Sequence, residues 1–252
     1  RSDNLASIWA EFKVDLSLRY QRALSKLEEK QKEVLEAIDQ WCLEYEQKIR
    51  ELGGIGFFLG GIGPDGHIGF NIRGSDHHST TRLMPTNYET QAAAATDLGG
   101  IEIARQRLVI TIGLGTITFN PECSAIIIAA GEAKAGVVAD AIQQERNVKY
   151  PATALQSLAN ARFYLTKGAA KKLIHRQFLQ LSWLPEIQDE QMEQIIIDLA
   201  VAKNKKILDL TSSDLDQNPK AKLVLKQRTV TQQDLCLLVK NSLVQKIEKG
   251  AK

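Results

Sequence analysis

The chain has 252 residues, and 32 basic residues against 30 acidic ones give it a formal net charge of +2. This near-balance supplies no electrostatic reason to expect a nucleic-acid or membrane partner. Hydrophobic residues make up 44% of the chain and charged residues 25%. These are the proportions of an ordinary globular protein, and they exclude a mostly disordered, collagen-like or disulfide-stapled chain.

Cysteine usage and the chain ends predict the cellular setting. Cys42, Cys123 and Cys236 are odd in number and far apart, which predicts reduced, mostly buried thiols in a cytoplasmic protein. No apolar run approaches the ~20 residues of a membrane span, and the first residues do not have the pattern of a signal peptide. The chain begins with Arg1 rather than Met, so we expect it to be a piece of a longer protein.

The first segment, residues 4–51, is rich in charged helix formers and has no Gly or Pro. Its apolar residues recur at helical spacing, which predicts one long or two consecutive amphipathic helices, with Ser2 or Asp3 as N-cap. We expect this leader to pack on its own domain rather than in a coiled coil. The apolar positions are Leu24, Leu27, Val34, Leu35, Ile38, Trp41, Cys42, Tyr45 and Ile49.

Short apolar runs then alternate with helical segments. Such alternation predicts βαβ units, and therefore an α/β fold with a Rossmann-like, mostly parallel sheet. The second and third runs are expected to form central strands. The runs lie at 55–59, 108–113, 125–130 and 162–166.

The tail after residue 167 has few glycines and a mild excess of basic residues. Helical patterns lie at 169–181, 190–202 and 232–247, separated by turns near Pro185 and near Asn218-Pro219. The lysines at 203, 205 and 206 are interpreted as a solvated face rather than a nucleic-acid site. The predicted division is a helical leader at 1–52, an α/β core at 53–168 and a helical extension at 169–252.

The segment GGIGPDGHIGFN at 60–71 is the richest in chemistry. It places Asp65 and His67 just beyond a strand's carboxyl end, where open α/β sheets bind ligands. Glycines allow backbone N–H groups to approach an anion. An Asp two residues from a His orients the imidazole and suits it to proton transfer near neutral pH. The alternative interpretation is a purely structural glycine turn.

This segment resembles the signature of the glucosamine-6-phosphate deaminase/isomerase family, whose superfamily includes the 6-phosphogluconolactonases. Four later segments follow in the family's order, and the match covers about 41–166. The sequence IGFN at 68–71 is similar to the deaminase continuation rather than the lactonase one. The four segments are STTR at 79–82, TIGLGTI at 111–117, AGEAKA at 130–135 and PATALQ at 151–156.

The resemblance implies roles for individual residues. His67 would open the sugar ring by moving a proton to the ring oxygen, with Asp65 orienting and charging it. Lys134 would bind the substrate phosphate at the start of a helix. Further substrate contacts are expected from Gly61, Gly63, Gly66 and Asn71. Ser75 and Arg82 would fall on an allosteric sugar-phosphate site; Arg82 could instead contact the ligand directly or form an ion pair.

Four departures from the family pattern weaken the assigned catalytic and regulatory roles. Ile72 stands where the family has a Glu of its proton relay, and Met84 replaces a basic residue of the allosteric site. The stretch 88–100 lacks the family's phosphate-binding Arg, and Arg105 or Arg107 is a hypothetical substitute for it. The family's amino-terminal half, with a phosphate-binding turn and the Asp that moves a proton between C1 and C2, has no counterpart before Gly53.

The resemblance therefore implies an enzyme that converts an amino-sugar or aldose 6-phosphate to a ketose 6-phosphate, with ammonia release from the amino sugar. The alternatives are a catalytically impaired sugar-phosphate-binding module and a 6-phosphogluconolactonase-like hydrolase. We expect a small sugar phosphate as partner, no cofactor and no metal, since Asp76-His77-His78 matches no common zinc spacing. The oligomeric state stays open, with a homo-oligomer among the states considered.

Overall fold

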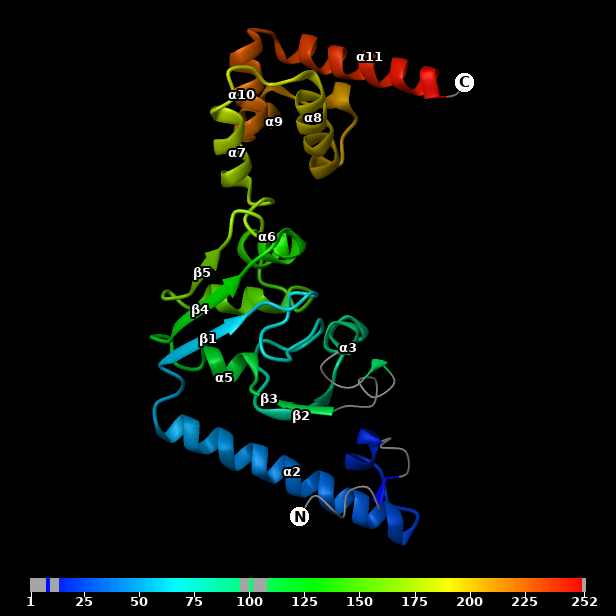
Figure 1. Cartoon of the computed structure of the whole chain (residues 1–252), viewed down its shortest axis with the longest axis vertical. Helices are drawn as coiled ribbons and strands as arrows, with labels where there is room; N and C mark the ends of the chain where they lie inside the picture. Colours follow the sequence, from blue (N-terminus) through cyan, green and yellow to red (C-terminus); the bar gives the residue numbers. More distant parts are fainter. Residues whose placement is uncertain (1–7, 10–13, 96–99, 102–107, 251–252) are drawn as a thin grey trace. The chain divides into compact units, whose positions relative to one another are not determined.

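The computed structural model describes residues 8–9, 14–95, 100–101 and 108–250. The chain divides into unit 1, residues 1–173, and unit 2, residues 174–252 (Figure 1). The three-part division at residues 52 and 168 stays a prediction. The predicted N-caps Ser2 and Asp3, and the substitute cations Arg105 and Arg107, lie outside the described residues.

The long helix of unit 1 is α2, Lys26–Glu51, preceded by the 3-10 turn η3, Leu16–Arg19. It begins at residue 26 because the Ser25 hydroxyl caps it by accepting a hydrogen bond from the backbone N–H of Glu28 at 3.2 Å. It ends before Gly53 and Gly54, which both have positive φ. The predicted leader helix is thus confirmed from residue 26 onward, whereas residues 20–25 are not helical.

Three parallel strands form the main sheet: β1, Phe57–Gly61; β4, Ser124–Ala129; and β5, Arg162–Leu165, in the order β1-β4-β5. The predicted α/β class, with its parallel sheet and helical segments before and after it, is confirmed. One face of the sheet packs against α5, Leu114–Thr118, α6, Ala135–Gln143, and the 3-10 helix η5, Pro151–Ser157. This face forms the core of unit 1.

The run at 108–113 does not form a central strand of that sheet, so this prediction is wrong. Its strand β3, Leu108–Thr111, pairs antiparallel with β2, Arg82–Pro85, in a separate two-stranded sheet. The helix α3, Tyr88–Ala94, follows β2. The backbone of residues 79–80 lies so close to Gly113 that no Cβ would fit there, and this close approach places β3 beside β2.

Unit 2 is helical. Its helices are α7, Ile174–Ser182; α8, Asp189–Lys203; α9, Ser212–Gln217; α10, Pro219–Arg228; and α11, Gln232–Gly250, with the 3-10 turn η6, Ile207–Asp209.

The predicted helices at 190–202 and 232–247 are confirmed, and the one at 169–181 is confirmed only from residue 174 onward, because residues 169–172 form turns and Leu173 is not helical. The helices α9 and α10 were not predicted. The Asn218-Pro219 pair was interpreted as a turn, and it starts α10 instead. Asn218 caps this helix by accepting from the N–H groups of Lys220 and Ala221, both at 3.0 Å, and Pro219 occupies its first position.

All three cysteines are free and buried, in agreement with the sequence. Burial raises the pKa of the Cys123 thiol, which keeps it protonated and unreactive. Within the described residues, none of the helices has both the length and the apolar character needed to cross a bilayer.

Candidate functional site

Asp65 and His67 form a close pair in the loop that follows β1. The Nδ1 atom of His67 lies 2.5 Å from Oδ1 of Asp65. The Asp65 side chain is completely buried, whereas the His67 side chain keeps 12% of its surface exposed. An ionised carboxylate can only accept a hydrogen bond, so Nδ1 of His67 is the donor and Nε2 is the nitrogen left to exchange a proton. The predicted pair is therefore arranged for proton transfer through Nε2.

The surroundings of Asp65 keep its carboxylate ionised. Its Oδ2 atom accepts hydrogen bonds from Asn87 Nδ2 at 2.6 Å and from the backbone N–H of Arg73 at 3.4 Å. Burial raises the pKa of Asp65, but the hydrogen bond and charge of His67 and the hydrogen bond from Asn87 together lower it to about 2. The negative charge that orients His67 is thus present at every pH near neutrality.

The glycine turn between β1 and His67 is closed by its own backbone. The N–H of Gly63 donates to the His67 carbonyl at 2.9 Å, and the N–H of Gly66 donates to the Gly63 carbonyl at 3.1 Å. A Cβ at Gly63 would collide with the imidazole of His67. The turn therefore seats the His67 ring directly against Gly63, and these two N–H groups are engaged within the turn rather than free to hold an anion.

Lys134 reaches the same turn from the neighbouring strand. It ends the 3-10 turn η4, Glu132–Lys134, which follows β4. Its Nζ atom donates to the Ile62 carbonyl at 2.8 Å, which uses one of the three N–H donors of the ammonium. Burial lowers the pKa of Lys134, and the nearby Asp65 carboxylate opposes this by raising it. The structure thus brings Lys134, Asp65 and His67 together at the carboxyl ends of β1 and β4.

Asn71, Ser75 and Arg82 form a separate hydrogen-bonded group. The buried Asn71 amide donates to the carbonyls of Ile68 at 2.9 Å and Ile112 at 2.8 Å, and its oxygen accepts from Arg82 at 2.9 Å. Arg82 also donates to the Ser75 hydroxyl at 3.2 Å. The amide and guanidinium groups predicted to meet a ligand are occupied with fixing the loop after His67. Gly61 lies within β1, paired with Ile128.

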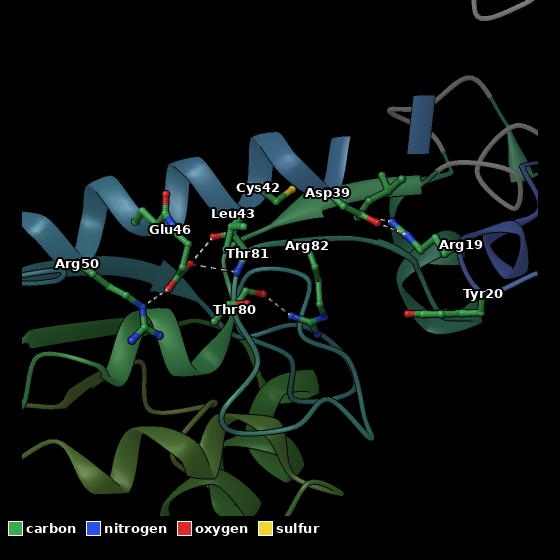
Figure 2. A pocket seen from close by; sticks show the side chains of 12 residues that line it. Arg19, Tyr20, Asp39, Cys42, Leu43, Glu46, Arg50, Thr80, Thr81 and Arg82 are labelled. Carbon is green, nitrogen blue, oxygen red and sulfur yellow. Dashed lines mark hydrogen bonds and ion pairs between the residues drawn. The ribbon is translucent and has the colours of Figure 1, made fainter. Parts of the chain in front are cut away.

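Arg82 also lines an open cavity of about 560 Å³ between α2 and the segment leading into β2 (Figure 2). Figure 2 shows Glu46 and Arg50 on α2, with Glu46 directed toward Thr81. One oxygen of the buried Glu46 accepts from the hydroxyls of Thr81 at 2.9 Å and Thr116 at 2.8 Å. These bonds fasten α2 to α5 and to Thr81, the residue directly before β2.

Sequence reasoning missed the residues that support the pair from a distance. Asn87 caps α3 by accepting from the N–H of Thr90 at 3.1 Å, and its amide nitrogen reaches Asp65, 22 positions earlier. The Thr111 hydroxyl accepts from the N–H of Phe70 at 3.0 Å. An N-cap pattern was available to find the start of α3, but no local signal connects it to Asp65.

The run Asp76-His77-His78 and the residue Ile72 were also singled out from the sequence. The Asp76 carboxylate accepts from the backbone N–H of His78 at 2.8 Å. Among the residues that the structure describes, no group of three or more His, Cys, Asp or Glu side chains is arranged to hold a metal ion. Ile72 is half-buried in the loop after Asn71.

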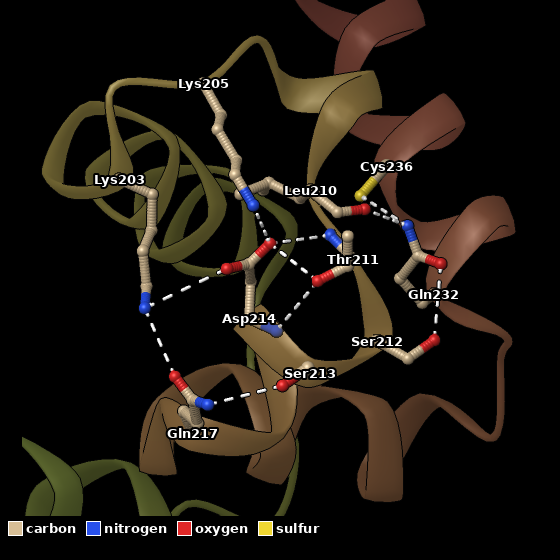
Figure 3. Close-up of polar contacts among 10 residues, drawn as sticks. All are labelled: Lys203, Lys205, Leu210, Thr211, Ser212, Ser213, Asp214, Gln217, Gln232 and Cys236. Carbon is tan, nitrogen blue, oxygen red and sulfur yellow. Dashed lines mark hydrogen bonds and ion pairs between the residues drawn. The ribbon is translucent and has the colours of Figure 1, made fainter.

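A dense polar network also occurs in unit 2 (Figure 3). Asp214 Oδ2 accepts from Lys205 Nζ at 2.6 Å and from the Thr211 hydroxyl at 2.7 Å, while Lys203 Nζ lies 3.8 Å from Oδ1. In return, the Thr211 hydroxyl accepts from the N–H of Asp214 and caps α9. Two of the lysines interpreted as a solvated face thus form ion pairs at a helix start.

Curated proteins similar to this chain include glucosamine-6-phosphate deaminases and a glucosamine-6-phosphate isomerase. A glucosamine-6-phosphate deaminase of Borreliella afzelii is 38% identical over 136 residues, which cover 54% of this chain and 50% of that protein. A glucosamine-6-phosphate isomerase of Candida albicans is 33% identical over 133 residues, covering 53% of this chain and 54% of that protein. The chain therefore spans about half the length of these relatives. No family model matches it.

A longer alignment extends the comparison. A putative glucosamine-6-phosphate deaminase-like protein of Bacteroides thetaiotaomicron is 31% identical over 192 residues, covering 75% of this chain and 28% of that protein. Since unit 1 has 173 residues, this alignment extends into unit 2. The solved structure of a monomeric glucosamine-6-phosphate deaminase aligns at 28% identity with a TM-score of 0.49, over 53% of this chain and 54% of that one. Over about half of its length, this chain is homologous to the glucosamine-6-phosphate deaminases and isomerases.

Proposed function

We propose that this chain supplies the ring-opening and phosphate-binding part of a glucosamine-6-phosphate deaminase/isomerase, which converts an amino-sugar or aldose 6-phosphate to a ketose 6-phosphate. The observation that carries the proposal is the His67–Asp65 pair, with its 2.5 Å contact and its buried, ionised carboxylate. The family name of the curated relatives supports the choice of substrate.

Ring opening needs a group that takes one proton and returns it nearby. His67 takes the proton of the C1 hydroxyl at Nε2, the C1–O5 bond breaks as the C1 carbonyl forms, and the ring oxygen receives the proton. The Asp65 carboxylate stabilises the imidazolium that exists between these transfers. Asp65 itself stays ionised throughout, since its pKa of about 2 is far below neutral pH.

Lys134 binds the 6-phosphate through its two further ammonium donors. Its hydrogen bond to Ile62 holds it beside the glycine turn, and as a point charge it attracts a phosphate without imposing a fixed geometry. The subsequent C1–C2 proton shift, which releases ammonia from the amino sugar, needs a further carboxylate. The resemblance assigns that carboxylate to the family's amino-terminal half.

A second candidate is a sugar-phosphate-binding module without catalysis. Ile72 favours it, because isoleucine cannot transfer the proton that the family's Glu would relay. The variant Ile72→Glu separates the two: an impaired enzyme gains ring-opening activity, whereas a binding module does not. A lactonase-like hydrolase is disfavoured by Phe70 and Asn71, and it would hydrolyse 6-phosphogluconolactone without releasing ammonia.

The decisive experiment measures ring opening by itself. Exchange NMR of glucosamine 6-phosphate reports the interconversion of its two anomers, which requires the open chain. We expect the protein to accelerate this exchange and His67→Asn to abolish the acceleration, while the exposed His78→Asn leaves it unchanged. Parallel assays of ammonia and fructose 6-phosphate report the complete reaction. Tight binding without faster anomer exchange would overturn the enzymatic proposal in favour of the binding module.

Phosphate binding is tested by calorimetry with glucosamine 6-phosphate. Lys134→Ala is expected to weaken binding by about 10-fold or more, because a charge-assisted hydrogen bond contributes roughly 1.5–3 kcal/mol. The exposed Lys149→Ala is the matched control and should leave the affinity unchanged. Equal affinity of the Lys134 variant and wild type would remove Lys134 from the site.

A further inference from the structure

Among the residues of unit 1 that the structure describes, one apolar face of the main sheet is largely exposed. Phe57 and Leu59 of β1, Ile128 of β4 and Tyr164 of β5 are 60%, 58%, 55% and 60% exposed, respectively. Ile128 lies opposite Tyr164 in the strand register. Side chains alternate between faces along a strand, and the intervening residues belong to the core on the other face. We call this set of four residues the outward face.

Such a face is unusual for a sheet of this kind. Parallel strands are normally covered on both faces, because their connections place helices there. In unit 1, α5, α6 and η5 pack with the same face, the one that carries Ala125 and Ile127. Four large apolar side chains from three neighbouring strands form the type of exposed patch that marks an interaction surface. The outward face is therefore a surface for a polypeptide rather than for solvent.

The free edge of β1 adds backbone groups to this surface. Within the described residues, β1 has a neighbouring strand, β4, on one edge only. Its sequence, FFLGG, contains no charge or proline that would discourage a further strand from pairing. The opposite edge strand, β5, begins with Arg162, a residue type that protects edges. A further strand is thus expected to pair with β1 rather than β5.

The comparisons indicate what occupies this surface. The matched segment covers 50% of the Borreliella afzelii deaminase and 54% of the Candida albicans isomerase. In each relative, about half of the protein lies outside the aligned segment. A segment of that size is large enough to add strands and to cover one face of a three-stranded sheet with helices.

We propose that the outward face and the free β1 edge bind a strand-and-helix polypeptide segment equivalent to the half of these relatives that this chain does not match. A strand of the segment pairs with β1, and apolar side chains of its helices cover Phe57, Leu59, Ile128 and Tyr164. The proposal is independent of the proposed reaction, because it concerns binding alone and its test contains no activity measurement.

The test uses the 252-residue chain and, as probe, the longest continuous segment of the Borreliella afzelii deaminase outside the matched 136 residues. The two are refolded together and examined by analytical ultracentrifugation and by hydrogen exchange with mass spectrometry. We expect the chain alone to be monomeric with rapidly exchanging β1 amides. With the probe, we expect a 1:1 complex in which those amides exchange at least tenfold more slowly.

Variants distinguish specific binding at the outward face from nonspecific association of exposed apolar side chains. Leu59→Lys and Ile128→Lys place charges on the outward face, and we expect each to weaken the complex at least tenfold. Both side chains are more than half exposed, so far-UV circular dichroism should show an unchanged fold. Val201→Lys changes an equally aliphatic side chain that is 75% exposed in unit 2, and it should not affect the complex.

Three results would overturn the proposal. A dimer of the chain alone, with protected β1 amides and dissociated by Leu59→Lys, would identify a second copy as the occupant. Slow exchange of β1 in a monomeric chain would mean that the edge is already covered. Absence of any association with the probe would mean that the surface does not accept this segment.

Discussion

Asp65 in unit 1 and Asp214 in unit 2 are two carboxylates with similar burial and hydrogen bonding but different partners. Each is buried, each accepts several hydrogen bonds, and each has a lowered pKa. At Asp214, the hydrogen bonds from Lys205 and Thr211 hold the pKa well below its usual range. Burial raises the pKa at both sites, and at Asp65, where burial is the largest single influence, it is outweighed by His67 and Asn87 together.

The difference lies in what the partners can do. Lysine and threonine keep their protonation near neutral pH, so the Asp214 network can only stabilise the start of α9. Imidazole is a side chain able to exchange protons near neutral pH, and Asp65 holds Nδ1 of His67, which leaves Nε2 for that exchange. A lowered carboxylate pKa therefore indicates strong hydrogen bonding in both units, whereas only Asp65 has a partner suited to catalysis.

The largest expected effect on activity comes from removing the charge of Asp65, with removal of the Asp214 charge as the control. Asp65→Asn should reduce the acceleration of anomer exchange by about 10²–10⁴-fold, the usual contribution of a positioned acid–base group, because the neutral amide no longer stabilises the imidazolium. Exchange NMR of glucosamine 6-phosphate measures it. Asp214→Asn is the matched control and should leave the exchange unchanged while lowering the urea midpoint of unit 2. Equal effects of both variants on exchange would contradict the distinction drawn between the two carboxylates.

A smaller effect is expected when the His67 ring is displaced without altering its chemistry. In Gly63→Ala the new Cβ would overlap the imidazole, so the ring must move. A displacement of about 1 Å costs roughly 100-fold in rate. Gly56→Ala is the control, because nothing lies within 4 Å of a Cβ there. The same NMR assay applies, and an unchanged rate in Gly63→Ala would mean that the ring position does not govern the activity.

Acid should then weaken unit 1 through Asp65. The folded-state pKa of about 2 lies below the ordinary value of 3.8, so the carboxylate stabilises the fold above pH 4 and loses this contribution as the pH falls toward 2. The loss amounts to about 2 kcal/mol. Urea unfolding between pH 5 and pH 2, followed by hydrogen exchange in β1, measures it. In Asp65→Asn the decrease should be smaller by that amount; an identical pH dependence would refute the assignment.

Local sequence signals predicted the parts of the molecule that depend on local rules. The period of apolar residues predicted α2, and apolar runs between glycines predicted β1 and β4. The order of Asp65 and His67 in a glycine turn predicted their pairing. The resemblance to the deaminase family, rather than composition, added Lys134, and the structure places it at the same turn.

The remaining features depend on contacts between distant segments. The run at 108–111 has the composition of a buried strand, but its partner β2, with the sequence RLMP, has no alternating pattern that would reveal it. Asn87 reaches Asp65 only because α3 begins beside the glycine turn. Asn71 and Arg82 were expected at a ligand and are engaged with each other. Sequence patterns define which groups are available, whereas tertiary contacts decide which of them stay free.

The smallest expected effect concerns the Asp214 network itself. Thr211→Ala removes the hydroxyl that accepts from the N–H of Asp214 at 3.2 Å and caps α9. Loss of a threonine N-cap costs about 1 kcal/mol. Urea unfolding followed by hydrogen exchange should show this loss in the helices of unit 2, while β1 and the anomer exchange at His67 stay as in wild type. A change at His67 would show that the two carboxylate networks are energetically coupled, and their comparison as independent sites would then fail.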